Sequence, residues 1–256
     1  MPQRNYRGQR SKLPIILFLI VFLAAAIVAF FFFRSRAQYP PSTNEHAPAQ
    51  SSQSSQSPQP EKESEIPWYL TLVNEDHPLP EDHEVETRTL SNGLTYDSRA
   101  YDALNEMLDA CRAEGLEPIV CSAYRSVERQ TELFENKINQ YLADGLSYDE
   151  AYEAAATVVA IPGTSEHNLG LAVDLCALSY QLLDESQENT AEQQWLMAHC
   201  HEYGFILRYP NGKSDITGII YEPWHYRYVG KDAAEEIMSS GLCLEEYIEL
   251  HYTLDE

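Results

Sequence analysis

The sequence predicts an α+β domain built on a small antiparallel sheet flanked by helices, preceded by one transmembrane helix and a disordered tether. Helical and strand patterns are mixed without the regular βαβ alternation of a parallel sheet. A long apolar segment and a Ser/Gln/Pro-rich segment come before the first of these patterns. These changes of composition divide the 256 residues into a basic tail (1–12), an apolar span (13–33), a linker (34–65) and a folded domain (66–256).

The apolar span predicts a membrane anchor. Its 21 residues carry no charge and are nearly all apolar, which matches the roughly 20 residues that a helix needs to cross a bilayer. Four basic residues precede the span and two follow it closely, so the positive-inside rule favours a cytoplasmic N-terminus. We therefore expect a single-pass protein of the cell membrane with an extracytoplasmic domain. A cleaved signal peptide is the alternative, although the apolar run exceeds a usual signal core and no clear A-x-A site follows it.

The linker and the charge of the chain limit what the protein can bind. Residues 34–65 are rich in Ser, Gln and Pro, and such a segment buries too little apolar surface to fold. Six basic and no acidic residues lie in the first 36 residues, so the rest of the chain carries a formal charge of −29, against −23 for the whole. An acidic body of this kind repels phosphate backbones, which argues against a nucleic-acid partner.

The cysteines leave disulfide pairing open. All five follow the apolar span, where oxidising conditions outside the cytoplasm permit disulfides. An odd number leaves at least one thiol without an intramolecular partner, and no C-x-x-C pattern supports a thiolate zinc cluster. Buried free thiols are at least as plausible as bridges, and we propose no connectivity. The five are Cys111, Cys121, Cys176, Cys200 and Cys243.

The first half of the folded domain shows three elements. Residues 66–74 (IPWYLTLVN) have the aromatic and β-branched pattern of a strand. Apolar residues recur at helical spacing over residues 101–111, and Gly115 is placed to end that helix. Residues 117–123 (EPIVCSA) then read as a buried strand.

In the second half, capping-box patterns and short apolar runs predict the remaining elements. Ser147 with Glu150, and Thr190 with Gln193, each predict the start of a helix. Polar helices are expected from about residue 232 onward. Short strands are expected at residues 171–175, 205–207 and 219–221.

The stretch SEHNLGLAVD places an imidazole, His167, in a turn and a carboxylate, Asp174, seven residues later on a strand. Because alternate residues of a strand share a face, Leu171, Val173 and Leu175 face the core, and Asp174 faces the other way among small neighbours. This arrangement suits the floor of a site. For this segment alone, an equally good interpretation is that His167 is an ordinary loop histidine and Asp174 caps the end of a strand.

The stretch EPWH adds a second imidazole, His225, three residues after a carboxylate, Glu222. On a regular strand these two would face opposite sides, so both reach one ion only if the backbone bends, with which Pro223 is consistent. Two histidines and one aspartate leave a tetrahedral zinc with one position for water, and Glu222 is then free to take the water's proton. As a fourth ligand Glu222 would close the site and make it structural, so its role separates an enzyme from a scaffold.

Other candidates are weaker on sequence alone. Arg125 follows the buried strand and is either a surface arginine or a group that binds a substrate carboxylate or an oxyanion. His199 and His201 fall two residues apart on a predicted helix, which places them on different sides. We assign ordinary roles to the rival ligands His77, His83, His199, His201 and His251.

The stretches SAYRS, SEHNLGLAVDL, YGFILRYP and YEPWHYRYVG, in this order, resemble the VanY-type D-alanyl-D-alanine carboxypeptidases, which are zinc peptidases of bacterial cell walls. The resemblance covers roughly residues 72–230 and implies a small antiparallel sheet flanked by helices, with one zinc ion. The positions it matches are the zinc ligands His167, Asp174 and His225, the base Glu222, and the substrate contacts Arg125, Gln130 and Ser165.

The implied reaction is hydrolysis of the last peptide bond of a peptidoglycan stem peptide ending in D-Ala. Two catalytic alternatives remain: an L,D-carboxypeptidase acting on tetrapeptide stems, which the motifs do not separate from the first, and an endopeptidase acting within cross-links. An alternative from another class is a non-catalytic, zinc-containing cell-wall binding module. The presence of Glu222 beside the proposed ligands disfavours that module.

Overall fold

The computed structural model describes residues 65–80 and 82–253, and within them no helix combines the length and apolar character needed to cross a membrane. The expected basic tail, the apolar span at 13–33 and the linker up to residue 64 lie outside the described residues. The described part has the predicted α+β architecture with small antiparallel sheets.

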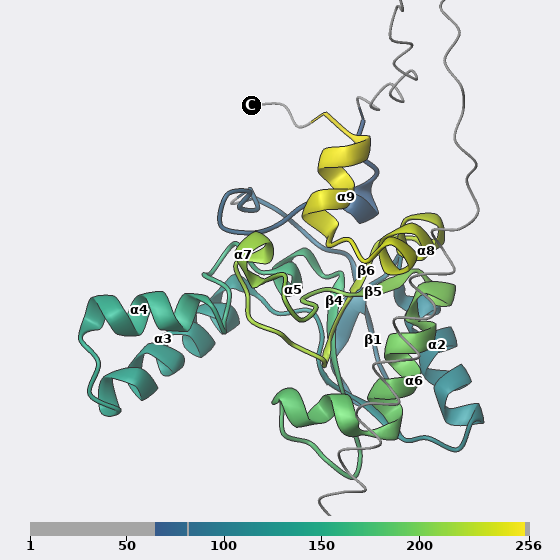
Figure 1. Ribbon diagram of the computed structural model, residues 1–256, viewed down its shortest axis with the longest axis horizontal. Helices are drawn as coiled ribbons and strands as arrows, with labels where there is room; N and C mark the ends of the chain where they lie inside the picture. The colour runs from purple at the N-terminus through teal and green to yellow at the C-terminus, as the bar shows by residue number, and fades with distance from the viewer. Residues whose placement is uncertain (1–64, 81, 254–256) are drawn as a thin grey trace, which may run out of the picture. The chain divides into compact units, whose positions relative to one another are not determined.

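The central sheet has four antiparallel strands in the order β3-β4-β6-β5, of which β4, β6 and β5 are labelled in Figure 1. Two of them, β3 (Pro118–Ser122) and β5 (Phe205–Leu207), agree with the sequence prediction. The strand expected at 171–175 is β4 (Ala172–Ala177), and β6 is formed by His225–Tyr228. A separate two-stranded sheet joins β1 (Thr87–Thr89) to β2 (Thr95–Asp97).

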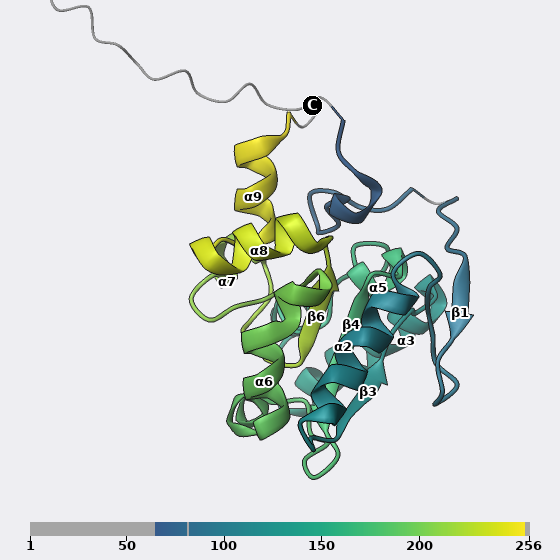
Figure 2. The same ribbon diagram turned by 90° about the vertical axis from the view of Figure 1, so that its right-hand side faces the viewer.

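Helices α2 (Tyr101–Ala113) and α6 (Ala191–His199) cover one face of the central sheet (Figure 2). The predicted core residues Leu171, Val173 and Leu175 pack there, each fully buried. Burial of such side chains stabilises the fold by about 1.5–3 kcal/mol each. The helix starts and stops follow the predicted signals, because Gly115 follows the end of α2 and the Thr190 side chain caps α6. The opposite face of β4 is left for Asp174.

Helices α3 (Val127–Ala143) and α4 (Tyr148–Ala156) pack against each other as a helical hairpin beside the sheet (Figure 1). Ser126 caps α3, and Ser147 with Glu150 forms the predicted capping box of α4. The predicted C-terminal helices are α8 (Lys231–Ser240) and α9 (Leu244–His251), which share a core with β5. The remaining short helices are η1 (Trp68–Leu70), α5 (Glu166–Leu169), η2 (Glu185–Asn189), η3 (Cys200–Tyr203) and α7 (Ser214–Thr217).

Two predicted strands are wrong. Residues 66–74 contain the single turn η1, because the carbonyl groups of Tyr69 and Thr71 accept hydrogen bonds from the buried guanidinium of Arg227 instead of a neighbouring strand. Residues 219–221 are irregular, since their backbone bonds to loops, as in the 3.0 Å contact from the Ile220 amide to the Thr157 carbonyl. In the first segment the apolar pattern correctly marked buried side chains, those of Leu70 and Val73, but not a strand partner. In the second it marked neither, because the Ile220 side chain is exposed.

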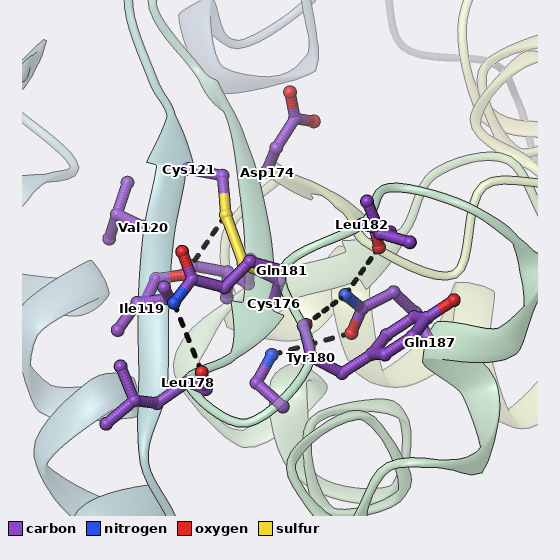
Figure 3. Close-up of a disulfide and its surroundings, with 12 residues drawn as sticks. Ile119, Val120, Cys121, Asp174, Cys176, Leu178, Tyr180, Gln181, Leu182 and Gln187 are labelled. Carbon is purple, nitrogen blue, oxygen red and sulfur yellow. Dashed lines mark hydrogen bonds between the residues drawn. A yellow bond between two sulfur atoms is a disulfide. The ribbon is translucent and has the colours of Figure 1, made fainter.

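A disulfide joins Cys121 of β3 to Cys176 of β4 (Figure 3). The two strands are neighbours, and Cys176 lies two residues beyond Asp174, on the same strand. The other three cysteines are buried free thiols, Cys111, Cys200 and Cys243. The bridge therefore joins the strand that carries Asp174 to the edge strand of the sheet.

We predict that the Cys121→Ser/Cys176→Ser double variant unfolds at lower urea concentration than the oxidised protein. Cross-linking two residues 55 positions apart restricts the unfolded chain and contributes about 4 kcal/mol in the chain-entropy treatment. The reduced wild type should unfold like the double variant. A non-reducing peptide map without a Cys121–Cys176 fragment would contradict the assignment.

Candidate metal and catalytic site

A cleft of about 380 Å³ opens between α3, the loop after α4, the start of α5, Asp174 of β4 and the segment that leads into β6. It is the place where the sequence candidates meet. All seven predicted site residues line it: Arg125, Gln130, Ser165, His167, Asp174, Glu222 and His225.

Strand pairing and one short helix position the three proposed ligands. The register of β4 against β6 places Asp174 directly opposite His225, and α5 carries His167 just before β4. Gly170 makes the turn between α5 and β4 with φ of +84°, and a Cβ there would lie 2.7 Å from Cγ1 of Val85, so only glycine fits. One ligand atom from each of the three buried side chains lies within 4.8 Å of the others.

Hydrogen bonds orient both imidazole rings. Nδ1 of His167 donates to the Ala123 carbonyl at 2.7 Å, which leaves Nε2 facing the cleft. Nδ1 of His225 lies 3.0 Å from Oδ1 of Asp174, and its Nε2 lies 3.7 Å from Oε2 of Glu166. Those last two atoms are buried and have no hydrogen-bond partner among the described residues. The Glu166 carboxylate thus favours a proton on Nε2 of His225 and leaves Nδ1 directed at Asp174.

Two buried arginines hold Glu166 in place. Oε1 of Glu166 accepts from Nε of Arg208 at 2.7 Å and from Nη1 of Arg227 at 2.8 Å. Burial by itself opposes ionisation of this carboxyl, but the two guanidinium groups outweigh it and hold its pKa well below the ordinary value. Arg208 also pairs with Glu245 at the start of α9. A fixed carboxylate therefore lies behind His225.

The guanidinium of Arg125 lies at the point toward which two of the proposed ligand atoms are directed. Its Nη2 donates to Nε2 of His167 at 2.9 Å and to Oδ2 of Asp174 at 2.7 Å. Its Nη1 donates to Oε1 of Gln130 at 3.1 Å, and Gln130 in turn donates to the Ala160 carbonyl. Two ligand atoms of the group thus already accept from one cation. Two imidazoles and one carboxylate around such a point fit a zinc ion with one open position.

The bend expected at Pro223 is a turn. The His225 amide donates to the Glu222 carbonyl at 3.1 Å, residues 223–224 form the turn, and β6 begins at His225. Oε2 of Glu222 consequently lies 3.6 Å from Nδ1 of His225, at the edge of the ligand group. Burial raises the pKa of Glu222 to about 8, which suits a carboxyl group that exchanges protons near neutral pH.

The two histidines differ in basicity. Burial, followed by the nearby charge of Arg125, lowers the pKa of His167 to about 4, so its imidazole is neutral at pH 7. Burial also opposes protonation of His225, but the neighbouring carboxylates of Asp174 and Glu166 outweigh it and raise the pKa to about 9. A metal ligand must be deprotonated, so ion binding releases a proton from His225.

The rival histidines lie elsewhere. Within the described part of the chain, His167, Asp174 and His225 form the only group of three or more His, Cys, Asp or Glu side chains that could hold an ion. Four rivals have other polar neighbours, His77 with Asn74, His199 with Glu202, His201 with Glu235 and His251 with Glu236.

Three buried charged residues beside the site, Glu166, Arg208 and Arg227, were not identified from the sequence. All three lie inside the quoted stretches, and each is buried. The available signal was a charged residue set among apolar ones in segments expected to be inside, as in FILRYP and HYRYVG, because a buried charge requires a partner.

The part of the chain that forms the cleft is similar to a known protein family. The family model described as "VanY: D-alanyl-D-alanine carboxypeptidase" matches residues 94–231. A D-alanyl-D-alanine carboxypeptidase of Enterococcus faecalis is 45% identical over 190 residues, which cover 73% of this chain and 68% of that protein.

Solved structures agree with the sequence match. VanYB in complex with D-alanine-D-alanine superposes with a TM-score of 0.67 at 45% identity, covering 72% of this chain and 98% of that one. A Glu-to-Ala mutant of the VanY D,D-pentapeptidase from a VanB-type resistance cassette, in complex with Zn(II), superposes with a TM-score of 0.66 at 46% identity. That match covers 71% of this chain and 99% of the other. The LdcB LD-carboxypeptidase superposes with a TM-score of 0.60 at 38% identity, covering 71% of this chain and 86% of that one.

We predict that Glu166→Gln lowers the affinity for Zn(II) by roughly tenfold to a hundredfold, because the carboxylate that orients His225 becomes a neutral amide. Glu245→Gln is the matched control, since it also removes a negative charge beside Arg208 but leaves Glu166 facing His225. Competition with a chromophoric chelator measures both. Equal zinc affinities of the two variants would show that Glu166 does not orient the ligand.

Proposed function

Because the chain belongs to the VanY family of D-alanyl-D-alanine carboxypeptidases, we propose that the residues of this cleft hydrolyse the last peptide bond of peptidoglycan stem peptides and release D-alanine. The protein is a zinc metallopeptidase of this family. The observation that carries the proposal is the buried His167, Asp174 and His225 group with the Glu222 carboxylate at its edge.

We assign the zinc ligands to Nε2 of His167, the carboxylate of Asp174 and Nδ1 of His225. This choice rests on the orientation of the rings, because the other nitrogen of each imidazole faces a carbonyl or a carboxylate. A bound zinc ion lowers the pKa of a water molecule toward neutrality and polarises the carbonyl of the scissile bond. Three protein ligands leave room for this chemistry.

Glu222 is the proposed base. It has no direct hydrogen bond to another described side chain, and it lies beside the ligand group, so it can accept a proton from the attacking water and deliver it to the leaving amine. A role as a fourth zinc ligand would remove this capacity. Glu222 is not part of the group of three side chains whose ligand atoms lie within 4.8 Å of one another.

Arg125, Gln130 and Ser165 are the proposed substrate contacts. Arg125 donates to the lone pairs that the ion would use, so loading of the site frees its guanidinium for the substrate's C-terminal carboxylate or for negative charge on the tetrahedral intermediate. Gln130 holds one edge of the guanidinium, and the Ser165 hydroxyl lines the cleft at the start of α5.

Anchoring in the membrane is a further part of the proposal and rests on composition alone. The uncharged apolar run at 13–33 has the length of a bilayer-spanning helix, and the basic residues around it favour a cytoplasmic N-terminus. The linker at 34–65 then tethers the catalytic domain on the outer side, where its peptidoglycan substrate lies.

For the reaction, we expect the full-length protein loaded with zinc to release one D-alanine from a defined pentapeptide stem and to leave the tetrapeptide stem intact, as mass analysis of the products reports. Glu222→Ala should retain zinc and lose nearly all release. Cleavage of the tetrapeptide instead would favour the L,D-carboxypeptidase, and cleavage within cross-linked dimers the endopeptidase. Loss of zinc from Glu222→Ala would make Glu222 a ligand.

For the anchor, we expect the full-length chain to stay with the membrane fraction after an alkaline wash, whereas a chain lacking residues 1–36 is released. Immunoblotting of the fractions and N-terminal analysis of the protein measure this. Release of the full-length chain, or an N-terminus beyond residue 33, would contradict an uncleaved anchor.

A further inference from the structure

Lys137 lines the cleft away from the proposed catalytic residues. At the catalytic end the ionisable groups are those of Arg125, Asp174 and Glu222, together with the two histidines. Among the described residues that line the rest of the cleft, Lys137 carries the only charged side chain, and its neighbours there are aliphatic and amide groups such as Leu133 and Gln140. The cleft therefore contains a cationic group, the ammonium of Lys137, away from the catalytic residues.

The ammonium group of Lys137 has no carboxylate within ion-pair distance in the part of the chain that the structure describes. Among the described residues, Nζ of Lys137 instead lies over the ring of Tyr141, 5.7 Å from the ring centroid. By contrast, every described arginine and Lys213 pair with a carboxylate. In a domain so rich in acidic residues, a cation without a carboxylate partner inside a cleft is free to bind an anionic group of a ligand.

Helix geometry places Lys137 along the substrate path. Gln130 and Lys137 lie seven residues apart on α3, which puts them on one face with a rise of about 10 Å between them. An extended peptide advances about 3.3 Å per residue, so this separation corresponds to about three residues. Gln130 contacts Arg125 at the catalytic end. A carboxypeptidase has one substrate residue on the leaving side, so the rest of the cleft must hold the acyl side.

We propose that Lys137 binds a free carboxylate of the peptide substrate, two to four residues before the scissile bond. The inference rests on the proposed function, because only a carboxypeptidase fixes the direction of the peptide in the cleft. The substrate class is an acidic peptide ending in D-Ala-D-Ala. Lys137 is then a specificity-determining residue that makes no contact with the reacting atoms.

The test uses pairs of acetylated pentapeptides ending in D-Ala-D-Ala, in which the second, third or fourth residue before the scissile bond is Glu or its neutral isostere Gln. For the full-length, zinc-loaded wild type, kcat/KM should be about threefold to tenfold higher for the Glu peptide at one of these positions. The preference should weaken as ionic strength rises.

Substitutions of Lys137 test whether this side chain causes the preference for the Glu peptide. Lys137→Met should reduce the Glu/Gln ratio to about one, and Lys137→Arg should keep it above one. Lys231→Met is the matched control. Nζ of Lys231 lies 5.9 Å from the ring centroid of Tyr203, and Lys231 has no ion pair among the described residues, but it does not line the cleft. It should keep the wild-type ratio.

The outcomes separate this inference from the proposed function. A wild-type ratio near one at all three positions, or an unchanged ratio in Lys137→Met, overturns the role of Lys137 while hydrolysis of the Gln peptides still supports the proposed function. Absence of D-alanine release from both members of every pair contradicts the proposed function, and the role of Lys137 with it.

Discussion

The antiparallel pairing of β4 with β6 is the constraint on which the site depends. Its register sets Asp174 opposite His225, and the same ladder pairs Ala172 with Arg227. A slip of one residue would turn Asp174 into the apolar core and expose Val173 to the cleft, because successive side chains alternate faces. The core packing of Leu171, Val173 and Leu175 therefore fixes the position of the carboxylate as firmly as any contact within the site.

A buried ionic cluster connects this pairing to both ends of the described domain. Arg227 binds Glu166 and the backbone of the segment around Tyr69, and Arg208 binds Glu166 and Glu245 of α9. Burying charges costs much of what their attraction returns, so such a cluster contributes little net stability by itself. Its value lies in orientation, because it holds one carboxylate oxygen of Glu166 toward Nε2 of His225. Segments far from the cleft thus help to place a proposed ligand.

The sequence predicted which side chains line the cleft better than it predicted the strands of the domain. His167 and Asp174 followed from a local pattern, and Gly170 accounts for the turn between them. Strand alternation also placed Asp174 correctly opposite the core. The expected strand at 219–221 failed because a strand needs a backbone partner, and here the Ile220 amide bonds to the Thr157 carbonyl at the end of α4 while the Ile220 side chain is exposed. Glu166 was missed for a related reason, since its partners Arg208 and Arg227 are distant in sequence and meet only in the folded sheet. Disulfide pairing needed the same information, because Cys121 and Cys176 become neighbours only through the β3–β4 ladder.

We propose that one zinc ion binds to His167, Asp174 and His225 and leaves Glu222 free. Anomalous diffraction from zinc-loaded crystals, measured on both sides of the zinc absorption edge, would locate this ion. We expect a single peak bonded to Nε2 of His167, a carboxylate oxygen of Asp174 and Nδ1 of His225, with the Glu222 carboxylate outside bonding distance. A peak bonded to Glu222, or one located away from these three side chains, would contradict it.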